Sequence, residues 1–279
     1  MTVLDCGGHT LDLRTCVVMG ILNITPDSFS DGGDFFCLDD AVRQALEMAR
    51  AGAAIIDIGG ESSRPGAEPV SVDEEIRRVV PVIQALHEAL AIPVSIDTCK
   101  PEVMRAAVAA GAGMINDVQA LQVPGALALA AELNVPVCLM HMQGKPRSMQ
   151  TAPCYMDVVN EVKVFLKARI DACVSAGISR DRLIIDPGFG FGKDLIHNLE
   201  LMKRLSEIVD LNVPLLTGVS RKSMIGRVLA NDPKERLSGS LALAALAVWQ
   251  GSRIIRAHDV RETVDAVKMV NAVCHQNMI

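Results

Sequence analysis

Two arginines and one histidine have side chains suited to binding phosphate groups. Arg64 lies a few residues after one apolar run, and Arg256 and His258 follow directly after another. A guanidinium group can donate two parallel hydrogen bonds to phosphate oxygens, and Ser62 and Ser63 add hydroxyl donors beside Arg64. A single arginine is more often a solvated surface residue. The three positions together nevertheless indicate a clamp for phosphate or pyrophosphate.

Asp97, Asn116 and Asp186 form a second polar group, and each of them follows a short apolar run. A carboxylate can accept two parallel hydrogen bonds from the edge of a flat heterocycle, and an asparagine can donate and accept beside it. Other interpretations remain open from the residues alone. Each carboxylate could cap a helix or pair with a lysine such as Lys100 or Lys193, or Asp97 and Asp186 could bind a metal or act as an acid–base pair.

Residues 218–223, with the sequence Gly-Val-Ser-Arg-Lys-Ser, open a predicted helix over 222–229. A helix N-terminus offers unpaired N–H groups to an anion. The spacing of a P-loop is absent, and a plain N-cap with a surface lysine is the alternative.

The glycine-rich segment 188–192 does not have the register of a dinucleotide-binding fingerprint. We expect its glycines to let the loop lie close to a bound ring, with Phe191 against that ring. His141 lacks the HExxH spacing of a zinc site. We therefore interpret it as a structural or stacking histidine.

Eight short apolar runs must position these side chains. A strand that is buried on both faces reads as a short run of β-branched and aliphatic residues. Eight such runs separated by helical patterns predict a single (β/α)8 barrel, the TIM barrel, in which all C-terminal strand ends converge on one mouth. The runs are 17–22, 54–58, 94–96, 114–115, 137–140, 183–185, 213–216 and 253–255.

Helical patterns with start and stop signals lie between these runs. Ser71 begins a capping-box sequence, Pro101 stands in a first turn, and Gly52 and Gly177 follow predicted helix ends. The predicted helices are 38–51, 71–90, 101–110, 155–176, 199–208, 222–229, 236–250 and 259–273.

The domain organisation expected from these patterns is simple. Residues 1–16 are expected to form an N-terminal flap or hairpin outside the barrel, and residues 17–279 the barrel itself. The polar loops 25–36 and 61–69 are expected to act as mobile lids at the mouth.

The composition argues against several classes of protein. The net charge of −6 argues against a nucleic-acid-binding protein, which is usually basic. The first 15 residues lack the pattern of a signal peptide, and the most apolar helical stretch, 241–249, is too short to span a bilayer. None of the eight cysteines forms a CxxC pair. We therefore expect reduced thiols in a cytosolic protein.

Several long motifs, in the right order, resemble those of the bacterial dihydropteroate synthases. They are Met-Gly-Ile-Leu-Asn-Ile-Thr-Pro-Asp-Ser-Phe-Ser-Asp-Gly-Gly at 19–33, Gly-Gly-Glu-Ser-Ser-Arg-Pro-Gly at 59–66, Asp-Pro-Gly-Phe-Gly-Phe-Gly-Lys at 186–193, Ser-Arg-Lys-Ser at 220–223 and Ile-Arg-Ala-His-Asp at 255–259. Two positions depart from the family pattern: Ser63 replaces the usual threonine, and Cys99 replaces a serine or tyrosine.

The resemblance implies a (β/α)8 fold and a specific reaction. In this reaction 6-hydroxymethyl-7,8-dihydropterin pyrophosphate and para-aminobenzoate condense to 7,8-dihydropteroate and pyrophosphate. It also implies a homodimer built through the late helices.

The resemblance further implies a role for each matching residue. The implied pterin-binding set is Asp97, Asn116, Met140, Asp186, Phe191 and Lys222. Ser63, Arg64, Arg256 and His258 would bind pyrophosphate, with Asn23 helping to hold Mg2+. Ser28, Phe29, Pro65 and Ser223 would form the para-aminobenzoate pocket, and Asp97, Lys222, Arg256 and His258 would be the catalytic residues.

Two rival functions share part of this pattern. A pterin-binding methyltransferase-type barrel would use Asp97, Asn116 and Asp186, but it would have no reason for Arg64 and Arg256. A non-catalytic pterin-binding barrel would tolerate loss of the pyrophosphate clamp, yet the clamp residues are present.

Overall fold

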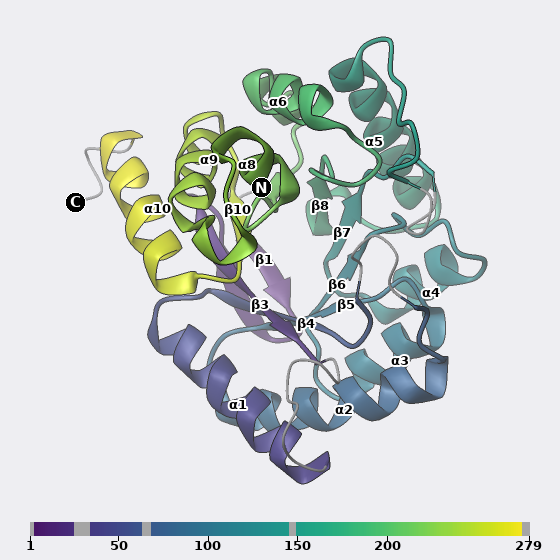
Figure 1. Ribbon diagram of the computed structural model, residues 1–279. Coiled ribbons are helices and arrows are strands. Elements are labelled where there is room, and N and C mark those ends of the chain that lie inside the picture. The colour runs from purple at the N-terminus through teal and green to yellow at the C-terminus, as the bar shows by residue number, and fades with distance from the viewer. Residues whose placement is uncertain (1–2, 25–33, 63–67, 145–148, 275–279) are drawn as a thin grey trace.

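A computed structural model describes residues 3–24, 34–62, 68–144 and 149–274 of this chain. Its centre is an eight-stranded parallel sheet with helices around the outside (Figure 1). The strands are β3 (Val17–Asn23), β4 (Ile55–Gly59), β5 (Val94–Asp97), β6 (Met114–Asp117), β7 (Val137–Met140), β8 (Leu183–Asp186), β9 (Leu216–Thr217) and β10 (Ile254–Ala257). Each predicted apolar run lies on or directly beside one of them, and the predicted (β/α)8 barrel is confirmed.

The order β8-β7-β6-β5-β4-β3-β10-β9 makes β8 and β9 the two edges that must meet to close the barrel. They meet through a single parallel bridge between Ile185 and Leu215, and the Ile185 N–H donates to the Pro214 carbonyl at 3.0 Å. Strand β9 is shorter than the predicted run 213–216. Pro214 lacks an N–H, so the ladder cannot continue through it.

The helices follow the predicted alternation, with two corrections. They are α1 (Asp34–Arg50), α2 (Val72–Ala89), α3 (Pro101–Ala109), α4 (Ala126–Leu133), α5 (Val158–Ser175), α6 (Leu195–Lys203), α7 (Ser206–Val209), α8 (Ser223–Leu229), α9 (Leu237–Trp249) and α10 (Val260–Cys274). The predicted helix 199–208 is wrong in its bounds. Helix α6 begins earlier, because Asp194 caps it and its carboxylate accepts from the His197 N–H at 2.8 Å. The helix is then interrupted between α6 and α7. Helix α4 is absent from the predicted helices, because its sequence is apolar almost throughout and shows no polar face.

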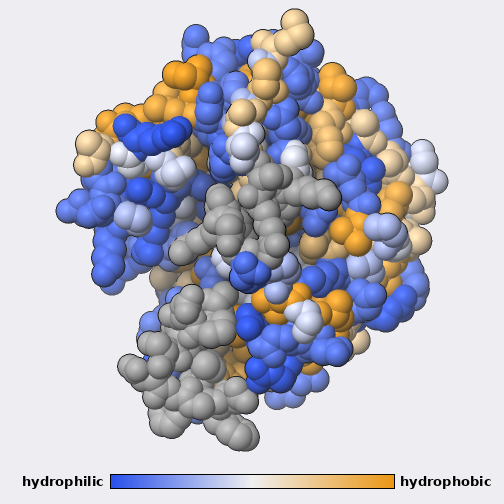
Figure 2. Space-filling view, turned by 45° about the vertical axis from the view of Figure 1, so that its right-hand side comes forward, coloured by the Kyte–Doolittle hydropathy of each residue, from blue (hydrophilic) through white to orange (hydrophobic). Residues whose placement is uncertain are grey.

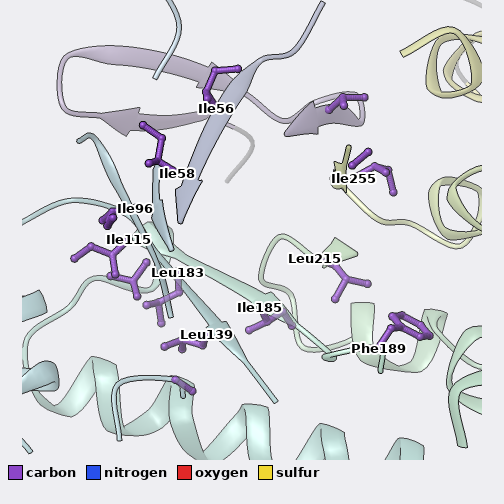
Figure 3. Close-up of a cluster of buried hydrophobic side chains, with 14 of the residues drawn as sticks. Ile56, Ile58, Ile96, Ile115, Leu139, Leu183, Ile185, Phe189, Leu215 and Ile255 are labelled. Carbon is purple, nitrogen blue, oxygen red and sulfur yellow. The ribbon is translucent and has the colours of Figure 1, made fainter. Parts of the chain in front are cut away.

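The strand side chains alternate between two apolar layers. Ile58, Ile96, Ile115 and Leu139 are fully buried and belong to the cluster that packs between the strands and the helices (Figure 3). The neighbouring residues point into the barrel, as a period of two requires. Burial of both faces explains why the strands read as continuous apolar runs.

An antiparallel hairpin, β1 (Val3–Cys6) and β2 (His9–Asp12), packs beneath the barrel. Leu4 and Leu11 share a buried cluster with the inward side chains of the barrel's lower layer, including Met19 and Ile184. A Cβ on Gly113 would lie 2.1 Å from the Cys6 carbonyl oxygen, so the hairpin approaches β6 closely. The hairpin therefore covers the amino end of the barrel and leaves the carboxyl end available for a site.

Within the described ranges, no helix is both long and apolar enough to cross a membrane. On the face drawn in Figure 2, hydrophobic residues form small separate groups between hydrophilic ones.

Candidate active site

A pocket of about 1030 Å³ lies at the mouth formed by the carboxyl ends of the strands. Ten of the residues that the sequence singled out line this one pocket. They are Asn23, Asp97, Asn116, Met140, Asp186, Phe191, Lys222, Ser223, Arg256 and His258. The remaining candidates, Ser28, Phe29, Ser63, Arg64 and Pro65, lie outside the described residues.

The strand register brings the polar group together. In the strand register, Asp97 lies opposite Gly59 of β4 on one side and Asn116 of β6 on the other, and Asp186 lies opposite Met140 of β7. In a parallel barrel, residues at paired strand ends point toward the same mouth. Asn116 and Asp186 are almost fully buried, and Asp97 keeps 12% of its side chain exposed.

Arg256 is held between two carboxylates inside the mouth. Its Nε donates to Asp57 Oδ2 at 2.6 Å, and its Nη2 donates to Asp97 Oδ2 at 2.8 Å. Burial disfavours its charge, but attraction to Asp57 and Asp97 raises the Arg256 pKa above its ordinary value. Asp97 therefore pairs with an arginine that is far away in sequence. Lys100 instead contacts Glu61 and Glu75.

Asp57 is the site residue that sequence reasoning missed. It is fully buried on β4, and the same Oδ2 that accepts from Arg256 also accepts from Asn116 Nδ2 at 3.0 Å. The available signal was a charged residue inside the apolar run Ile55-Ile56-Asp57-Ile58, because a carboxylate buried there needs partners. Asp57 therefore links Asn116 of the polar group to Arg256 of the cationic group.

The carboxylates of the polar group sit in surroundings that disfavour their charge. Burial raises the pKa of Asp97 to about 7, Arg256 opposes this rise, and the nearby charge of Asp57 adds to it. Burial also raises the pKa of Asp186, whose Oδ1 accepts from the Gly188 N–H at 2.7 Å. Carboxylates with such perturbed pKa values are typical of functional sites.

Lys222 lies against the aromatic wall of the pocket. Its Nζ is 4.2 Å from the centroid of the Phe191 ring, a cation–π distance. Burial lowers the pKa of Lys222 to about 8, while Asp186 opposes that shift. Phe191 packs with Met140 and Met149 in a small buried cluster beside the polar residues. The pocket thus combines an apolar surface with carboxylates, an amide and cations.

The glycines of segment 188–192 mainly allow this loop to lie close to the backbone of other residues. A Cβ on Gly188 would lie 1.9 Å from the His141 carbonyl oxygen, and one on Gly192 would lie 2.3 Å from the Gln143 carbonyl oxygen. Gly190 instead faces the side chain of a pocket residue, since its Cβ would meet Lys222 Cδ at 3.2 Å. The glycines therefore let the loop lie against the end of β7.

Lys193 and His141 hold this loop in place. Lys193 Nζ lies 2.9 Å from His141 Nδ1 and donates to the carbonyls of Gly188 at 2.9 Å and Phe191 at 3.1 Å. Burial lowers the pKa of His141 to about 2, so the ring is neutral and Nδ1 accepts. Its ring packs edge-on against Phe165 with centroids 4.9 Å apart. These contacts agree with a structural histidine, and no hydrogen bond joins Lys193 to Asp186.

Segment 218–223 is fixed by contacts to β10 and the start of α10. Ser220 Oγ lies 3.0 Å from His258 Nδ1, and the Arg221 side chain pairs with Asp259. The Arg221 backbone has a φ of +57° and its N–H donates to Ser240 Oγ at 3.0 Å. This bend directs Lys222 toward the pocket and places Ser223 at the first turn of α8.

A buried, partly apolar pocket with paired carboxylates at the mouth of a (β/α)8 barrel is suited to a flat, polar heterocycle. The family described as "Pterin binding enzyme" matches residues 19–258. The chain therefore belongs to the pterin binding enzymes.

Its similar relatives within that family are dihydropteroate synthases. The dihydropteroate synthase of Escherichia coli K12 is 56% identical over 265 residues, which cover 95% of this chain and 94% of that protein. A Xanthomonas albilineans dihydropteroate synthase structure with 4-aminobenzoic acid has a TM-score of 0.93 at 53% identity, and covers 98% of each chain. A second structure from that organism, with 7,8-dihydropteroate, has a TM-score of 0.90 at 51% identity, and covers 98% of this chain and 99% of that chain.

This likeness favours the synthase over both rival functions. The chain is a transferase that condenses 6-hydroxymethyl-7,8-dihydropterin pyrophosphate with para-aminobenzoate to give 7,8-dihydropteroate and pyrophosphate.

Proposed function

We propose that Asp97, Asn116, Asp186 and Lys222 bind the pterin of the first substrate, with Met140 and Phe191 against its ring. Support comes from their shared position at the mouth and from the burial of both carboxylates. The Gly188 N–H uses one lone pair of Asp186 Oδ1, so both carboxylate oxygens can still accept from a pair of N–H groups on the ring edge. The carboxylates that surround the pocket are the single observation that carries this assignment.

Arg256 and His258 bind the pyrophosphate, together with Ser63 and Arg64. Among the described residues, Arg256 Nη1 has no hydrogen-bond partner and can donate to a phosphate oxygen, while Nε and Nη2 hold the carboxylates. Asp57 orients this guanidinium group through a bond of 2.6 Å. A cation fixed in advance stabilises the charge that develops on a leaving group without having to reorganise.

Para-aminobenzoate binds between the two loops after β3 and β4 and the start of α8. Of the four proposed contact residues, Ser28, Phe29 and Pro65 lie outside the described residues. Ser223 is exposed, begins α8 and lines the same pocket as Asp97.

Mg2+ accompanies the pyrophosphate, and Asn23 is its protein ligand. The described residues contain no group of three His, Cys, Asp or Glu that could hold a metal. A single neutral amide oxygen nevertheless fits Mg2+, which keeps several waters and commonly binds through substrate phosphates. Asn23 is the last residue of β3 and lines the pocket. Its Oδ1 lies near Gly59 of β4, and β3 and the strand that carries Asp97 flank β4 on opposite sides. When bound, the ion would neutralise charge on the leaving pyrophosphate.

The residues favour a dissociative substitution. Pyrophosphate leaves with its electron pair, and the electron-rich dihydropterin stabilises the cation at its exocyclic methylene. Ionised Asp97 stabilises this cation. The neutral arylamine then attacks and releases a proton, so it need not be deprotonated beforehand. Asp97, Lys222, Arg256 and His258 are therefore the proposed catalytic residues.

The proposed function is tested by measuring pyrophosphate release with and without para-aminobenzoate. We expect release together with dihydropteroate formation when both substrates are present. A pterin-binding methyltransferase would release no pyrophosphate under either condition, and a non-catalytic protein would form no product.

We also propose a single barrel domain (17–279) with an N-terminal hairpin (1–16), a homodimer and a cytosolic location. Helices α9 and α10 pack together and expose four large apolar side chains: Leu246, Trp249, Met269 and Val273. Exposed apolar side chains of this kind suit contact with a second copy. The seven cysteines whose side chains the structure describes are free thiols, which agrees with a reducing compartment. Sedimentation of the Trp249→Glu variant tests the dimer.

A further inference from the structure

One buried ammonium group borders the part of the pocket that we assign to the pterin. Lys193 is 2% exposed and lines the pocket. Its Nζ lies 2.9 Å from His141 Nδ1 and donates to the carbonyls of Gly188 at 2.9 Å and Phe191 at 3.1 Å. Because His141 is neutral and accepts, all three N–H groups of the ammonium are used. Lys193 therefore acts on its surroundings through these three partners.

Both carbonyl acceptors belong to residues that place a group proposed to bind the pterin. The Gly188 N–H donates to Asp186 Oδ1 at 2.7 Å, and Asp186 is the proposed acceptor for the ring edge. Phe191 carries the ring proposed to lie against the pterin, and this ring packs in a small buried cluster with two methionines. The Phe191 N–H also donates to the Gly188 carbonyl at 3.1 Å, so the two residues close one turn. Lys193 thus holds the backbone behind both the edge acceptor and the aromatic ring.

Other side chains that bond to the same loop hold different residues. Asn198 Oδ1 accepts from the Gly190 N–H at 2.7 Å, and Gln150 Nε2 donates to the Gly190 carbonyl. The Tyr155 hydroxyl donates to the Gly192 carbonyl at 2.8 Å. Gly190 and Gly192 carry no side chain, so these bonds hold the loop without placing either the edge acceptor or the ring. The loop therefore offers its own internal comparison for the role of the ammonium.

A charge at this position is not needed merely to hold the loop, because Tyr155 and Asn198 hold it with uncharged groups. None of the three hydrogen-bond partners of Lys193 is a carboxylate, and burial of a cation without one is costly. Burial lowers the pKa of Lys193 to about 7, and the charge of Asp186 opposes that shift. Burial likewise raises the pKa of Asp186, and Lys222, Arg256 and Lys193 oppose that rise. The ammonium therefore favours the ionised carboxylate that a pair of ring N–H groups requires.

We propose that Lys193 is a positioning residue for the pterin, which acts through the backbone at Gly188 and Phe191 on the groups that contact the ring. This inference rests on the proposed function, in which Asp186 binds the ring edge and Phe191 lies against the ring. The para-aminobenzoate site is assigned to other parts of the chain, of which Ser223 at the start of α8 is described. Loss of the ammonium therefore weakens pterin binding and leaves the KM for para-aminobenzoate unchanged at saturating pterin pyrophosphate.

The test compares three variants with a reference. Lys193→Met keeps the long apolar stem and removes the ammonium, and it strands no charged hydrogen-bond partner. His141→Phe keeps a buried aromatic ring and removes only the Nδ1 acceptor, so it disturbs the same ammonium more mildly. Tyr155→Phe is the matched control, because it also removes one side-chain bond to a carbonyl of this loop, that of Gly192. Asp186→Asn is the reference for loss of a group that contacts the ring itself.

In Lys193→Met we expect the calorimetric Kd of a phosphate-free pterin to rise about tenfold, which corresponds to about 1.4 kcal/mol. The KM for pterin pyrophosphate should rise by a similar factor, while kcat stays within about threefold because binding rather than the reacting groups is altered. The KM for para-aminobenzoate should stay within about twofold. His141→Phe should change the same quantities in the same direction by less. Tyr155→Phe should change none of them, even where it lowers the melting temperature.

Two results would overturn the inference. The first is an unchanged pterin affinity in Lys193→Met while Asp186→Asn weakens it. The second is an equal loss of pterin affinity in Lys193→Met and Tyr155→Phe, which indicates general loosening of the loop. If Lys193→Met does not fold, His141→Phe is judged by the same two criteria. Failure of the proposed function would look different, because Asp186→Asn would then also leave the pterin affinity unchanged, and that result would overturn both.

Discussion

Arg256 and Asp57 are 199 residues apart in the sequence and form an ion pair of 2.6 Å inside the barrel. The pair joins the last strand of the chain to the second strand of the barrel. Asp97 accepts a second hydrogen bond, from Nη2 of the same guanidinium group, at 2.8 Å. The orientation of Arg256 in the mouth therefore depends on two buried or nearly buried carboxylates.

The Asp57→Asn substitution tests this dependence. It preserves the shape but removes a charged acceptor of Arg256, an interaction worth about 1.5–3 kcal/mol. We expect kcat/KM for the pterin pyrophosphate to fall by about 10- to 100-fold, with little change in fold. Glu132→Gln, which makes the same chemical change in an exposed pair with Arg105, is the control. If both variants behave alike, Asp57 does not position Arg256 for the reaction.

Asp186 is expected to bind the ring edge of the pterin through its carboxylate. In Asp186→Asn the amide oxygen can still accept from the Gly188 N–H, so the loop should keep its place. The loss of one charged acceptor should weaken pterin binding by about 1.5–3 kcal/mol. Calorimetric titration with a phosphate-free pterin measures this change, and an unaltered affinity would show that Asp186 does not contact the ring.

The pH dependence of kcat/KM should be bell-shaped. The pKa of Asp97 is raised to about 7, so lowering the pH below this value protonates Asp97 and removes its negative charge. The pKa of Lys222 is lowered to about 8, so raising the pH above this value removes its positive charge. Activity should therefore be highest between the two values and fall on both sides. In Asp57→Asn the acidic limb should move to lower pH, because a neighbouring negative charge is lost. A flat profile from about pH 6 to 9 would contradict the proposed roles.

Para-aminobenzoate is expected to bind after the pyrophosphate site is filled. Of its four proposed contact residues, only Ser223 belongs to a described helix, and the others come from the loops after β3 and β4. Mg2+ and pyrophosphate would order those loops first, which gives positive coupling of about 1–3 kcal/mol. The comparison is para-aminobenzoate affinity with Mg2+ alone and with Mg2+, pyrophosphate and a pterin together. Equal affinities would mean that its pocket is preformed.

Gly188 should not tolerate a side chain. Its φ is +68°, and a Cβ would lie 1.9 Å from the His141 carbonyl oxygen, so Gly188→Ala must displace the loop or β7. We expect the free energy of unfolding to fall by about 3 kcal/mol or more. Gly177→Ala is the matched control: its φ is +92°, but nothing lies within 4 Å of its Cβ, and left-handed strain alone should cost about 1–2 kcal/mol. Urea unfolding of both variants measures the difference, and equal costs would show that the close approach is unimportant.

The strands, the mouth and most of the site could be predicted from sequence, because each depends on local order along the chain. Apolar runs buried on both faces identify the strands, and the residues that follow each run must lie at the mouth of a parallel barrel. This reasoning placed Asp97, Asn116 and Asp186 correctly in one pocket. It also predicted segment 218–223 beside them, since that segment follows a strand and opens a helix.

Tertiary structure alone decided which side chains pair. Arg256 has two aspartates within reach because the sheet order places β10 next to β3, with β4 and β5 following, and no local pattern records that neighbourhood. Asp57 was hidden for the same reason, since a strand pattern does not reveal what lies across the barrel. The glycines at 188 and 192 are needed because their backbone lies against carbonyl groups that follow another strand. Lys193 is held by a histidine 52 residues away in the sequence. Spacing along a chain determines elements and their ends, whereas contacts across a closed barrel follow from register and closure.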